Sequence, residues 1–328
     1  MTDWFEALLA PGQARPKAAR TWRLHAQEKD QFFADYLPAD FLKALERAPA
    51  VGWRAAVEEG LPLLPAHAAS YTRDYFLEPY RADFVERLGL HPGDTVADIG
   101  CGWGFASQRC LEKGCRVAGT DNALQRLEFC RVRFEQQGFG DRFVGVELDA
   151  NRELPFRAGA FRAVIVSGLM EWLPCTAAGI PQEIQARFLR RCFDLLAPEG
   201  RAYLAIENRF WGWYFAGALD MHTRQPLVSI LPRRVARSLS LLFSGDDYRA
   251  HTYSILGYLR LFKQAGFRSV DVIYPRPDYV QPKETEVLIE GLSLDASWRE
   301  LGERLVAAGG RGLPRLLFGR SFMFLLTK

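Results

Sequence analysis

The chain has 328 residues, of which 48% are hydrophobic, 25% charged and 13% aromatic, and its formal net charge is +3. This composition predicts a globular protein with a sizeable core, and so small a net charge gives no support for a nucleic-acid partner. No apolar run approaches the ~20 residues that span a bilayer, and the first twenty residues lack the long apolar region of a signal peptide. Six cysteines without a C-x-x-C pair favour reduced thiols, so we expect a cytoplasmic protein.

The first part of the chain, residues 1–80, predicts helices without strands. Residues 31–37 and 40–48 carry apolar side chains at helical spacing, and Pro38 separates these two segments. We therefore expect an amino-terminal helical extension that serves as a lid. Tyr75, near the end of this extension, is a candidate for contact with the substrate, although helix packing explains it equally well.

Residues 81–207 show the alternation of strands and helices that is typical of α/β proteins. A helix is predicted at 81–88. Strands are predicted at 95–99, 116–120, 143–148, 163–167 and 202–206, and further helices at 105–113, 123–137 and 181–196. The strands are apolar without alternation, which indicates a parallel sheet covered by helices on both faces. The expected fold class is α/β, with a doubly wound, Rossmann-like core over residues 81–207.

The regular alternation stops after Glu207 for roughly forty residues. So long a connection is unusual in a compact domain unless it is functional. Residues 208–250 are dense in aromatic residues and arginine, and we expect them to form a cap inserted on the substrate side. Arg233, Arg234 and Arg237 beside an apolar run predict an amphipathic cap helix with a solvated face.

The last part of the chain, residues 251–328, is expected to complete the core. Its pattern predicts a helix at 251–266 and a strand at 269–274, then a mixed segment, and a final strand at 321–327. The expected result is a seven-stranded, mostly parallel sheet with an amino-terminal extension and an inserted cap.

Three closely spaced glycines follow the first predicted strand, in the stretch VADIGCGWGFAS at residues 96–107. A dinucleotide-binding fingerprint would require a glycine at the position of Phe105. Asp98 would repel a pyrophosphate at this turn, but it suits a ligand with a cationic amino-acid portion. Asp121, at the end of the next strand, is placed to accept hydrogen bonds from both hydroxyls of a ribose. A ribose, a cationic amino acid and no pyrophosphate together describe S-adenosylmethionine.

Five ordered segments extend this interpretation: DIGCGWG at 98–104, TD at 120–121, LDA at 148–150, SGLMEWL at 167–173 and LLAPEGR at 195–201. In order and spacing they resemble the class I S-adenosylmethionine-dependent methyltransferases. The resemblance implies S-adenosylmethionine as the cofactor and the following cofactor-binding positions: Asp98, Gly100, Cys101, Gly102, Gly104, Thr120, Asp121, Asn122, Asp149, Ala150, Ser167 and Gly168. Family members often have Asp in place of Arg162 and His in place of Trp172, which leaves the acceptor side open.

The acceptor is expected after the fifth strand, because ligands bind beyond the carboxyl ends of parallel strands. The strings IENR, WYFAG and DMHT in this region are similar to methyltransferases of bacterial saccharide and natural-product pathways. Methyl transfer from a sulfonium is an in-line displacement, and it needs a base only when the acceptor proton is hard to remove. The catalytic candidates are His222, His251 and Glu207, with structural roles open for both histidines. The substrate-binding candidates, for which packing of the cap is the alternative, are Tyr75, Asn208, Arg209, Trp213 and Tyr214.

The predicted function is transfer of a methyl group to an O, N or S atom of a small-molecule or saccharide-like acceptor by direct displacement. One alternative is a DNA or RNA methyltransferase. Pro174-Cys175 and Glu207-Asn208 resemble the nucleophile and acid pairs of DNA cytosine-5 methyltransferases, which makes Cys175 a candidate nucleophile. The other alternative is a non-catalytic subunit that keeps the fold for binding. We expect no nucleic-acid partner, no membrane span and no metal ion, and a homodimer stays open.

Overall fold

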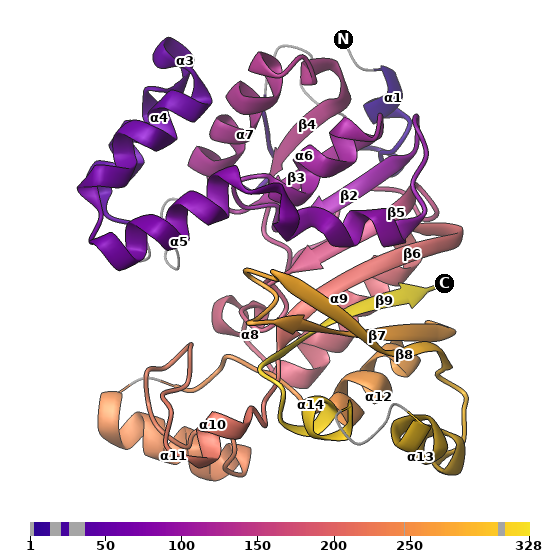
Figure 1. The fold of residues 1–328 in the computed structure, drawn as a ribbon. Coiled ribbons are helices and arrows are strands. Elements are labelled where there is room, and N and C mark those ends of the chain that lie inside the picture. Colours follow the sequence, from indigo (N-terminus) through magenta and orange to yellow (C-terminus); the bar gives the residue numbers. More distant parts are fainter. Residues whose placement is uncertain (1–2, 14–20, 26–36, 246, 308–311) are drawn as a thin grey trace. The chain divides into compact units, whose positions relative to one another are not determined.

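The computed structural model describes residues 3–13, 21–25, 37–245, 247–307 and 312–328, and Figure 1 labels most of its helices and strands. The chain forms two compact units. Unit 1 consists of residues 1–165 and 195–200, and unit 2 of residues 166–194 and 201–328. The predicted helix at 31–37 lies almost entirely outside the described residues.

Unit 1 holds the amino-terminal helices and the first strands. The amino-terminal part contains α1 (Asp3–Glu6), β1 (Thr21–Arg23), α2 (Ala39–Glu46), α3 (Ala48–Val51), α4 (Trp53–Gly60), η1 (Leu61–Leu63), α5 (Ala66–Leu77) and η2 (Pro79–Leu88). The alternating part contains β2 (Thr95–Ile99), α6 (Phe105–Glu112), β3 (Arg116–Asp121), α7 (Leu124–Gln136), η3 (Gly140–Arg142) and β4 (Phe143–Glu147). Two further strands, β5 (Phe161–Ser167) and β6 (Leu196–Glu207), begin in unit 1 and end in unit 2.

The strands of unit 1 lie in the order β1-β4-β3-β2, and all of these pairings are parallel. They are buried along nearly their whole length, as apolar strands without alternation should be when helices cover both faces. Ile99, the last residue of β2, lies opposite Thr120 of β3. The glycine loop that follows Ile99 is therefore adjacent to Asp121, the residue after Thr120.

The amino-terminal extension is not purely helical, so the prediction of helices without strands is wrong. β1 pairs with β4, with Thr21 opposite Gly145. A strand of three residues is too short for its alternation to stand out in a sequence. The helices themselves pack onto the glycine loop, since the ring centroid of Phe76 lies 5.3 Å from that of Trp103 and 5.7 Å from that of Phe129.

Unit 2 holds the remaining helices and strands. Its helices are α8 (Leu173–Thr176), α9 (Pro181–Leu195), α10 (Gly212–Phe215), α11 (Arg233–Ser244), α12 (Ile255–Ala265), α13 (Trp298–Ala307) and α14 (Gly312–Phe318). Its later strands are β7 (Ser269–Arg276), β8 (Glu284–Ser293) and β9 (Ser321–Thr327). The predicted strand at 321–327 is thus confirmed.

The strands of unit 2 add an antiparallel part to the fold. β6 pairs with β9, β9 with β7, and β7 with β8, and each pairing is antiparallel. The described residues contain nine strands, in the order β1-β4-β3-β2-β5-β6-β9-β7-β8, so the predicted number of seven is wrong. The two additional strands, β1 and β8, are the edges. β8 carries glutamates along its sequence, a common feature of edge strands that hid it in the mixed segment. The α/β class with a mostly parallel sheet is confirmed.

An aromatic core supports the end of β6. Tyr258 and Phe262 on α12 pack against Phe324 of β9, with centroid distances of 5.5 and 4.9 Å. The side chain of Ser254 begins this helix by accepting a hydrogen bond from Gly257 N. The hydroxyl of Tyr258 donates to the backbone carbonyl of Glu207 at 2.8 Å. The buried side chain of Tyr258 therefore fixes the position of Glu207, the last residue of β6.

Candidate active site

The glycine loop after β2 adopts backbone conformations that favour glycine. Gly102 and Gly104 have φ angles of 53° and 83°. A Cβ atom on Gly104 would lie 2.8 Å from Cys130 Sγ and from the ring of Phe134, so a larger residue would not fit. Among the described residues, a Cβ atom on Gly102 would meet only the hydroxyl of Tyr75, at 3.6 Å. Within the described part of the chain, the loop is thus a cradle that is tightly packed around Gly104 and loosely packed beside Gly102.

Asp121 fixes this cradle from the end of β3. Its Oδ2 accepts a hydrogen bond from Gly102 N at 2.9 Å, and its Oδ1 accepts one from Ala123 N at 2.9 Å. Arg126 lies 3.5 Å from Oδ1. The second hydrogen bond holds the turn that precedes α7, so Asp121 has a structural role beside the predicted binding of the ribose. The two roles are compatible, because each carboxylate oxygen can accept a further hydrogen bond.

Asp98 is buried at the end of β2, and its Oδ2 accepts a hydrogen bond from Ser107 Oγ at 2.6 Å. Burial raises the pKa of Asp98 to about 7, although the hydrogen bonds from Ser107 act in the opposite direction. The charge of Asp121 adds to the increase. A cationic group bound beside Asp98 would favour the ionised carboxylate, as expected for the amino group of S-adenosylmethionine.

The affinity for S-adenosylmethionine is therefore expected to increase with pH. With a pKa of about 7 in the free protein, Asp98 is protonated below neutrality, and binding of an ammonium group must first remove that proton. Because the binding-competent fraction scales the dissociation constant, affinity should be about 10-fold weaker at pH 6 than at pH 8. Calorimetric titrations at several pH values would measure this. The Asp98→Asn variant is the control, because the amino group of the ligand still titrates when this variant binds it. An identical dependence of affinity on pH in the wild type and in Asp98→Asn would contradict the role of Asp98.

The other predicted cofactor positions of unit 1 surround this cradle or follow β4. The backbone N–H groups of Gly100 and Cys101 both donate to Thr120 O at 2.8 Å. Thr120 Oγ1 is buried and has no hydrogen-bond partner among the described residues, so it is free to meet a ligand. Asp149 accepts a hydrogen bond from Asn151 N at 2.9 Å in a turn, Ala150 is buried, and Asn122 is partly buried. The glycine cradle, the hydroxyl of Thr120 and the carboxyl groups of Asp98 and Asp121 fit the amino-acid and ribose parts of S-adenosylmethionine.

Unit 2 contains a buried cluster of two glutamates and a histidine. Glu207 is the last residue of β6, and Glu171 follows β5 by four residues. Single ligand atoms of Glu171, Glu207 and His222 lie within 4.8 Å of one another. His222 Nε2 is 3.8 Å from Glu207 Oε2, and the hydroxyl of Tyr279 donates to Glu207 Oε1 at 3.0 Å. Two of the predicted catalytic residues, Glu207 and His222, are thus brought together.

Asp220 holds His222 in place from the other side. Asp220 Oδ1 accepts hydrogen bonds from the backbone N–H groups of His222 and Thr223, both at 2.9 Å. His222 Nδ1 lies 3.7 Å from the same oxygen, so the ring is placed between two carboxylates. Burial alone would raise the pKa of Asp220, but His222 and Ser229 together hold it well below its ordinary value. Burial alone would lower the pKa of His222, but Asp220 and Glu207 raise it.

Trp172 explains one departure from the family pattern. Its ring packs edge-on against His222, with centroids 4.7 Å apart. A side chain from the segment after β5 therefore contacts the imidazole supplied by the cap. Family members often have a histidine at position 172, whereas here Trp172 packs against the histidine at position 222.

Glu171 carries a carboxylate that the described residues leave without a hydrogen-bond partner. The residue has no exposed surface, and neither carboxylate oxygen has a hydrogen-bond partner among the described residues. Burial, and then the charge of Glu207, raise the pKa of Glu171 well above its ordinary value. A buried polar group of this kind costs free energy unless a proton or a ligand satisfies it.

The remaining candidates of the acceptor side have partners within the protein. Both hydrogens of the Asn208 amide have backbone acceptors, the carbonyls of Leu317 and Gly319 at 3.0 and 2.8 Å. Arg209 donates to two carbonyls of the cap. Burial and nearby arginines lower the pKa of His251 to about 3. Their predicted roles toward a substrate stay predictions.

The two aromatic candidates of α10 differ in exposure, since Tyr214 is buried and Trp213 is 65% exposed. Gly168, predicted on the cofactor side, has its Cβ position 2.6 Å from the Tyr279 hydroxyl and belongs to unit 2, as does Ser167. Sequence reasoning missed Glu171, Asp220 and Tyr279 as site residues. Glu171 and Asp220 stand inside the motifs SGLMEWL and DMHT, which was the available signal, whereas no motif marks Tyr279.

Cys175 has the properties of a structural thiol. Burial raises its pKa to about 12, although Arg249 acts in the opposite direction. A nucleophilic cysteine needs the thiolate form near neutral pH. The structure therefore weighs against covalent catalysis by Cys175.

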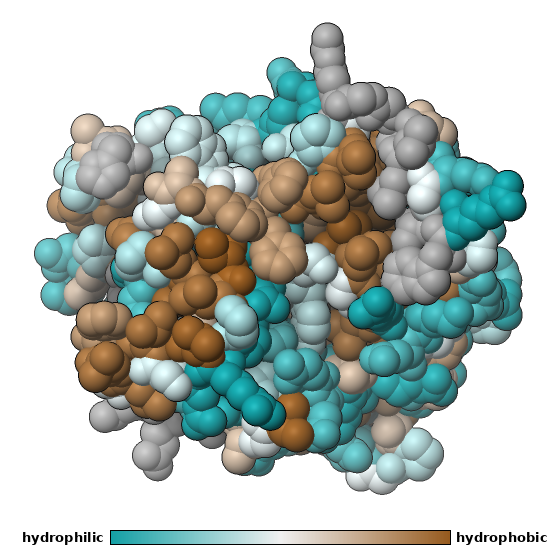
Figure 2. Space-filling view, turned by 90° about the horizontal axis from the view of Figure 1, so that it is seen from below, coloured by the Kyte–Doolittle hydropathy of each residue, from teal (hydrophilic) through white to brown (hydrophobic). Residues whose placement is uncertain are grey.

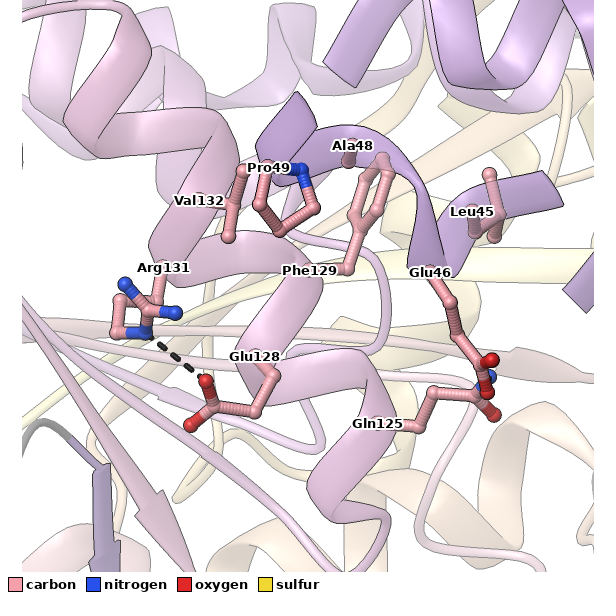
Figure 3. A pocket seen from close by; sticks show the side chains of 9 residues that line it. All are labelled: Leu45, Glu46, Ala48, Pro49, Gln125, Glu128, Phe129, Arg131 and Val132. Carbon is pink, nitrogen blue, oxygen red and sulfur yellow. Dashed lines mark hydrogen bonds and ion pairs between the residues drawn. The ribbon is translucent and has the colours of Figure 1, made fainter. Parts of the chain in front are cut away.

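A surface pocket of unit 1 is lined by residues other than the candidate site residues (Figure 3). It is lined by Leu45, Glu46, Ala48, Pro49, Gln125, Glu128, Phe129, Arg131 and Val132. Arg131 and Glu128 form an ion pair at its edge, 2.9 Å apart. The pocket contains none of the positions that the resemblance assigns to the cofactor, so it adds nothing to the site.

The cap carries an exposed apolar surface as well as arginines. Leu242 and Phe243 of α11 are 76% and 75% exposed, and Phe215 of α10 is also exposed. Figure 2, which shows the molecule from below, has apolar residues in several patches, with a large one on the left of the view. The predicted solvated face of α11 is thus partly apolar. No helix within the described ranges is both long and apolar enough to cross a membrane.

The mostly parallel sheet, the glycine cradle and the acid at the end of β3 define an S-adenosylmethionine-binding protein of the class I methyltransferase type. A family model described as a methyltransferase domain matches residues 96–200. Residues 96–200 thus form a methyltransferase domain, so the protein is an S-adenosylmethionine-dependent methyltransferase and S-adenosylmethionine is its cofactor.

The relatives found by sequence include ubiquinone biosynthesis O-methyltransferases. The enzyme of Chromobacterium violaceum is 27% identical over 204 residues, which are 62% of this chain and 81% of that enzyme. The enzyme of Xanthomonas campestris pv. campestris (strain B100) is 30% identical over 149 residues, 45% of this chain and 54% of that enzyme. The chain thus spans only about half the length of the second relative.

Solved methyltransferase structures match the chain at low sequence identity. A methyltransferase from Aquifex aeolicus is 12% identical, with a TM-score of 0.43 over 78% of this chain and 92% of that chain. Phosphoethanolamine N-methyltransferase 2 of Haemonchus contortus is 14% identical, with a TM-score of 0.49 over 88% of this chain and 60% of that chain.

Proposed function

We propose that the protein transfers the methyl group of S-adenosylmethionine to a hydroxyl oxygen of a small-molecule or saccharide-like acceptor. The observation that carries this proposal is the buried cluster of Glu171, Glu207 and His222 at the carboxyl ends of β5 and β6. Two carboxylates and an imidazole can orient a hydroxyl group and attract its proton. The names of the relatives, O-methyltransferases of ubiquinone biosynthesis, favour oxygen over nitrogen or sulfur as the methyl acceptor.

The cofactor supplies an electrophilic methyl group on a sulfonium. The protein has to bind the cofactor, align the acceptor oxygen with the carbon–sulfur bond, and exclude water. We assign cofactor binding to the glycine loop with Asp98, Thr120 and Asp121, and positioning of the acceptor to Glu207 and His222. In the reaction the carbon–sulfur bond breaks, sulfur keeps the electron pair, a carbon–oxygen bond forms, and the hydroxyl proton leaves.

The surroundings of the enzyme are part of the same proposal. All six cysteines are free thiols, which supports a reducing compartment such as the cytoplasm. We infer an acceptor other than nucleic acid, because the net charge is only +3. A homodimer is the oligomer to look for, and sedimentation of the purified chain would identify it.

The proposal is tested by supplying purified enzyme and S-adenosylmethionine with matched acceptors that present a hydroxyl, an amine or a thiol. Aromatic diols, simple sugars and their amino and thio analogues form such a panel. Formation of S-adenosylhomocysteine with the hydroxyl compounds, and a methyl ether in the mass spectrum, is the expected result. Methylation confined to amines or thiols would contradict transfer to oxygen.

The His222→Ala substitution is expected to lower turnover more than it lowers cofactor affinity. The imidazole is held between Asp220 and Glu207, whereas the glycine cradle lies in unit 1. We expect a loss in kcat of about 100-fold, the lower part of the range for a proton-transfer group, with the dissociation constant of S-adenosylmethionine nearly unchanged. His91→Ala, at an exposed position of unit 1, is the matched control. An unaltered kcat would remove His222 from the catalytic machinery.

A further inference from the structure

We propose that Glu171, Glu207 and His222 bind a divalent cation of the first transition series, such as Mn²⁺ or Zn²⁺. One ligand atom from each of these side chains lies within 4.8 Å of the other two, which is close enough for all three to reach one ion. The sequence contains no metal motif because the three ligands come from segments far apart in the chain. The catalytic role given to the ion below rests on the proposed transfer to oxygen, but the binding itself does not.

The hydrogen bonds around Glu207 and His222 leave one atom of each side chain available to bind a metal ion. Tyr279 donates to Oε1 of Glu207, and Oε2 has no hydrogen-bond partner among the described residues. His222 turns Nδ1 toward Asp220 and Nε2 toward Glu207 Oε2. A carboxylate behind a histidine ligand is the usual outer-shell arrangement of protein metal sites, because it fixes the ring and the tautomer.

Glu171 provides an independent observation that points to a ligand. Both of its carboxylate oxygens are fully buried, and neither has a hydrogen-bond partner among the described residues. Two buried carboxylates beside each other repel, and one divalent cation would neutralise both charges. Asp220 and Arg233 also act electrostatically on His222, and Tyr279 acts on Glu171.

The donor set indicates which cation fits. Two carboxylates favour Mg²⁺ and Mn²⁺, whereas an imidazole favours Zn²⁺ and Fe²⁺, so the mixed set suits Mn²⁺ or Zn²⁺ better than Ca²⁺. Three protein ligands leave coordination positions open, which is typical of catalytic rather than structural sites. An acceptor hydroxyl can occupy one of them.

The ion would make the hydroxyl a better nucleophile. An oxygen bound to a divalent cation loses its proton more readily. In this step the oxygen–hydrogen bond breaks and the proton passes to water, and the oxygen then displaces sulfur at the methyl carbon. His222 and the two glutamates hold the ion, and Asp220 keeps His222 in position.

The experiment uses the full chain, stripped of metal with EDTA and dialysed. Mn²⁺ binding is followed by the loss of the free-ion electron paramagnetic resonance signal, and Zn²⁺ binding by calorimetry, both without S-adenosylmethionine. We expect one site per chain. Glu171→Gln and His222→Gln should each weaken it by more than the roughly 10–100-fold that outer-shell substitutions cause. Glu183→Gln, at an exposed glutamate of α9, is the matched control.

Two further measurements keep the outcomes separate. Asp220→Asn should weaken Mn²⁺ binding by about 10–100-fold, and circular dichroism should show that Glu171→Gln is folded. Absence of Mn²⁺ and Zn²⁺ binding in the folded wild-type chain, or equal binding in Glu171→Gln, overturns the proposal. Methyl transfer that persists in EDTA would then leave the proposed function intact, whereas metal binding without any hydroxyl methylation would overturn the function and leave the site.

Discussion

Substitution of Asp121 by alanine is expected to weaken S-adenosylmethionine binding by about 1.5–3 kcal/mol, the range for hydrogen bonds to a charged group, or by about 10–150-fold in Kd. The side chain acts in two ways. Its carboxylate is the predicted acceptor for the ribose hydroxyls, and it already binds Gly102 N and Ala123 N. Loss of the carboxylate therefore removes a ligand contact and also frees the backbone of the glycine cradle.

Calorimetry on three variants separates these two contributions. Asp121→Asn keeps one oxygen that can accept a hydrogen bond from the backbone, so its affinity should fall between those of wild type and Asp121→Ala. Asp83→Ala removes an exposed aspartate from unit 1 and should bind as wild type does. Wild-type affinity in Asp121→Ala would contradict both the ribose assignment and the importance of the loop contact.

The alternating core was predictable because its signals are local. Helix α9 was expected at 181–196 and spans Pro181–Leu195, and β3 was expected at 116–120 and spans Arg116–Asp121. Buried parallel strands need continuous apolar runs, and the helices between them need apolar stripes. The local sequence of each element is therefore enough to predict it. The cofactor loop was equally visible, because the backbone angles of Gly102 and Gly104 restrict the residue type.

The parts that were missed depend on contacts distant in sequence. β1 forms because Thr21 and its two neighbours pair with the edge of β4. A segment of three residues is too short for its sequence to predict this pairing. The acceptor-side cluster depends on a meeting of Glu171, Glu207 and His222 that no spacing rule encodes. Tyr279 reaches Glu207 from 72 residues away. Glu207 and His222 were named as candidates from their residue type and their place after β6, whereas Glu171 was not singled out, although it lies inside the segment SGLMEWL.

Substitution of Glu207 by glutamine is expected to lower kcat by about 100-fold or more, the scale of a group that handles a proton in the transition state. Glutamine keeps the shape of the side chain and an oxygen that can accept the hydrogen bond from Tyr279, so the fold around β6 should persist. The charge is lost, and with it the attraction for the acceptor proton or for a cation shared with Glu171. The dissociation constant of S-adenosylmethionine should change little, because the cradle with Asp98 and Asp121 belongs to unit 1.

Steady-state kinetics with a hydroxyl acceptor and calorimetry with the cofactor measure the two effects separately. Glu183→Gln, which removes an exposed charge of unit 2, should retain wild-type kcat. A wild-type kcat in Glu207→Gln would show that the end of β6 takes no part in the chemistry. If kcat falls and Mn²⁺ binding falls with it, the carboxylate acts through the cation. If kcat falls in a protein that never bound Mn²⁺ or Zn²⁺, the carboxylate acts on the hydroxyl directly, because the substitution then changes only the charge that meets the acceptor.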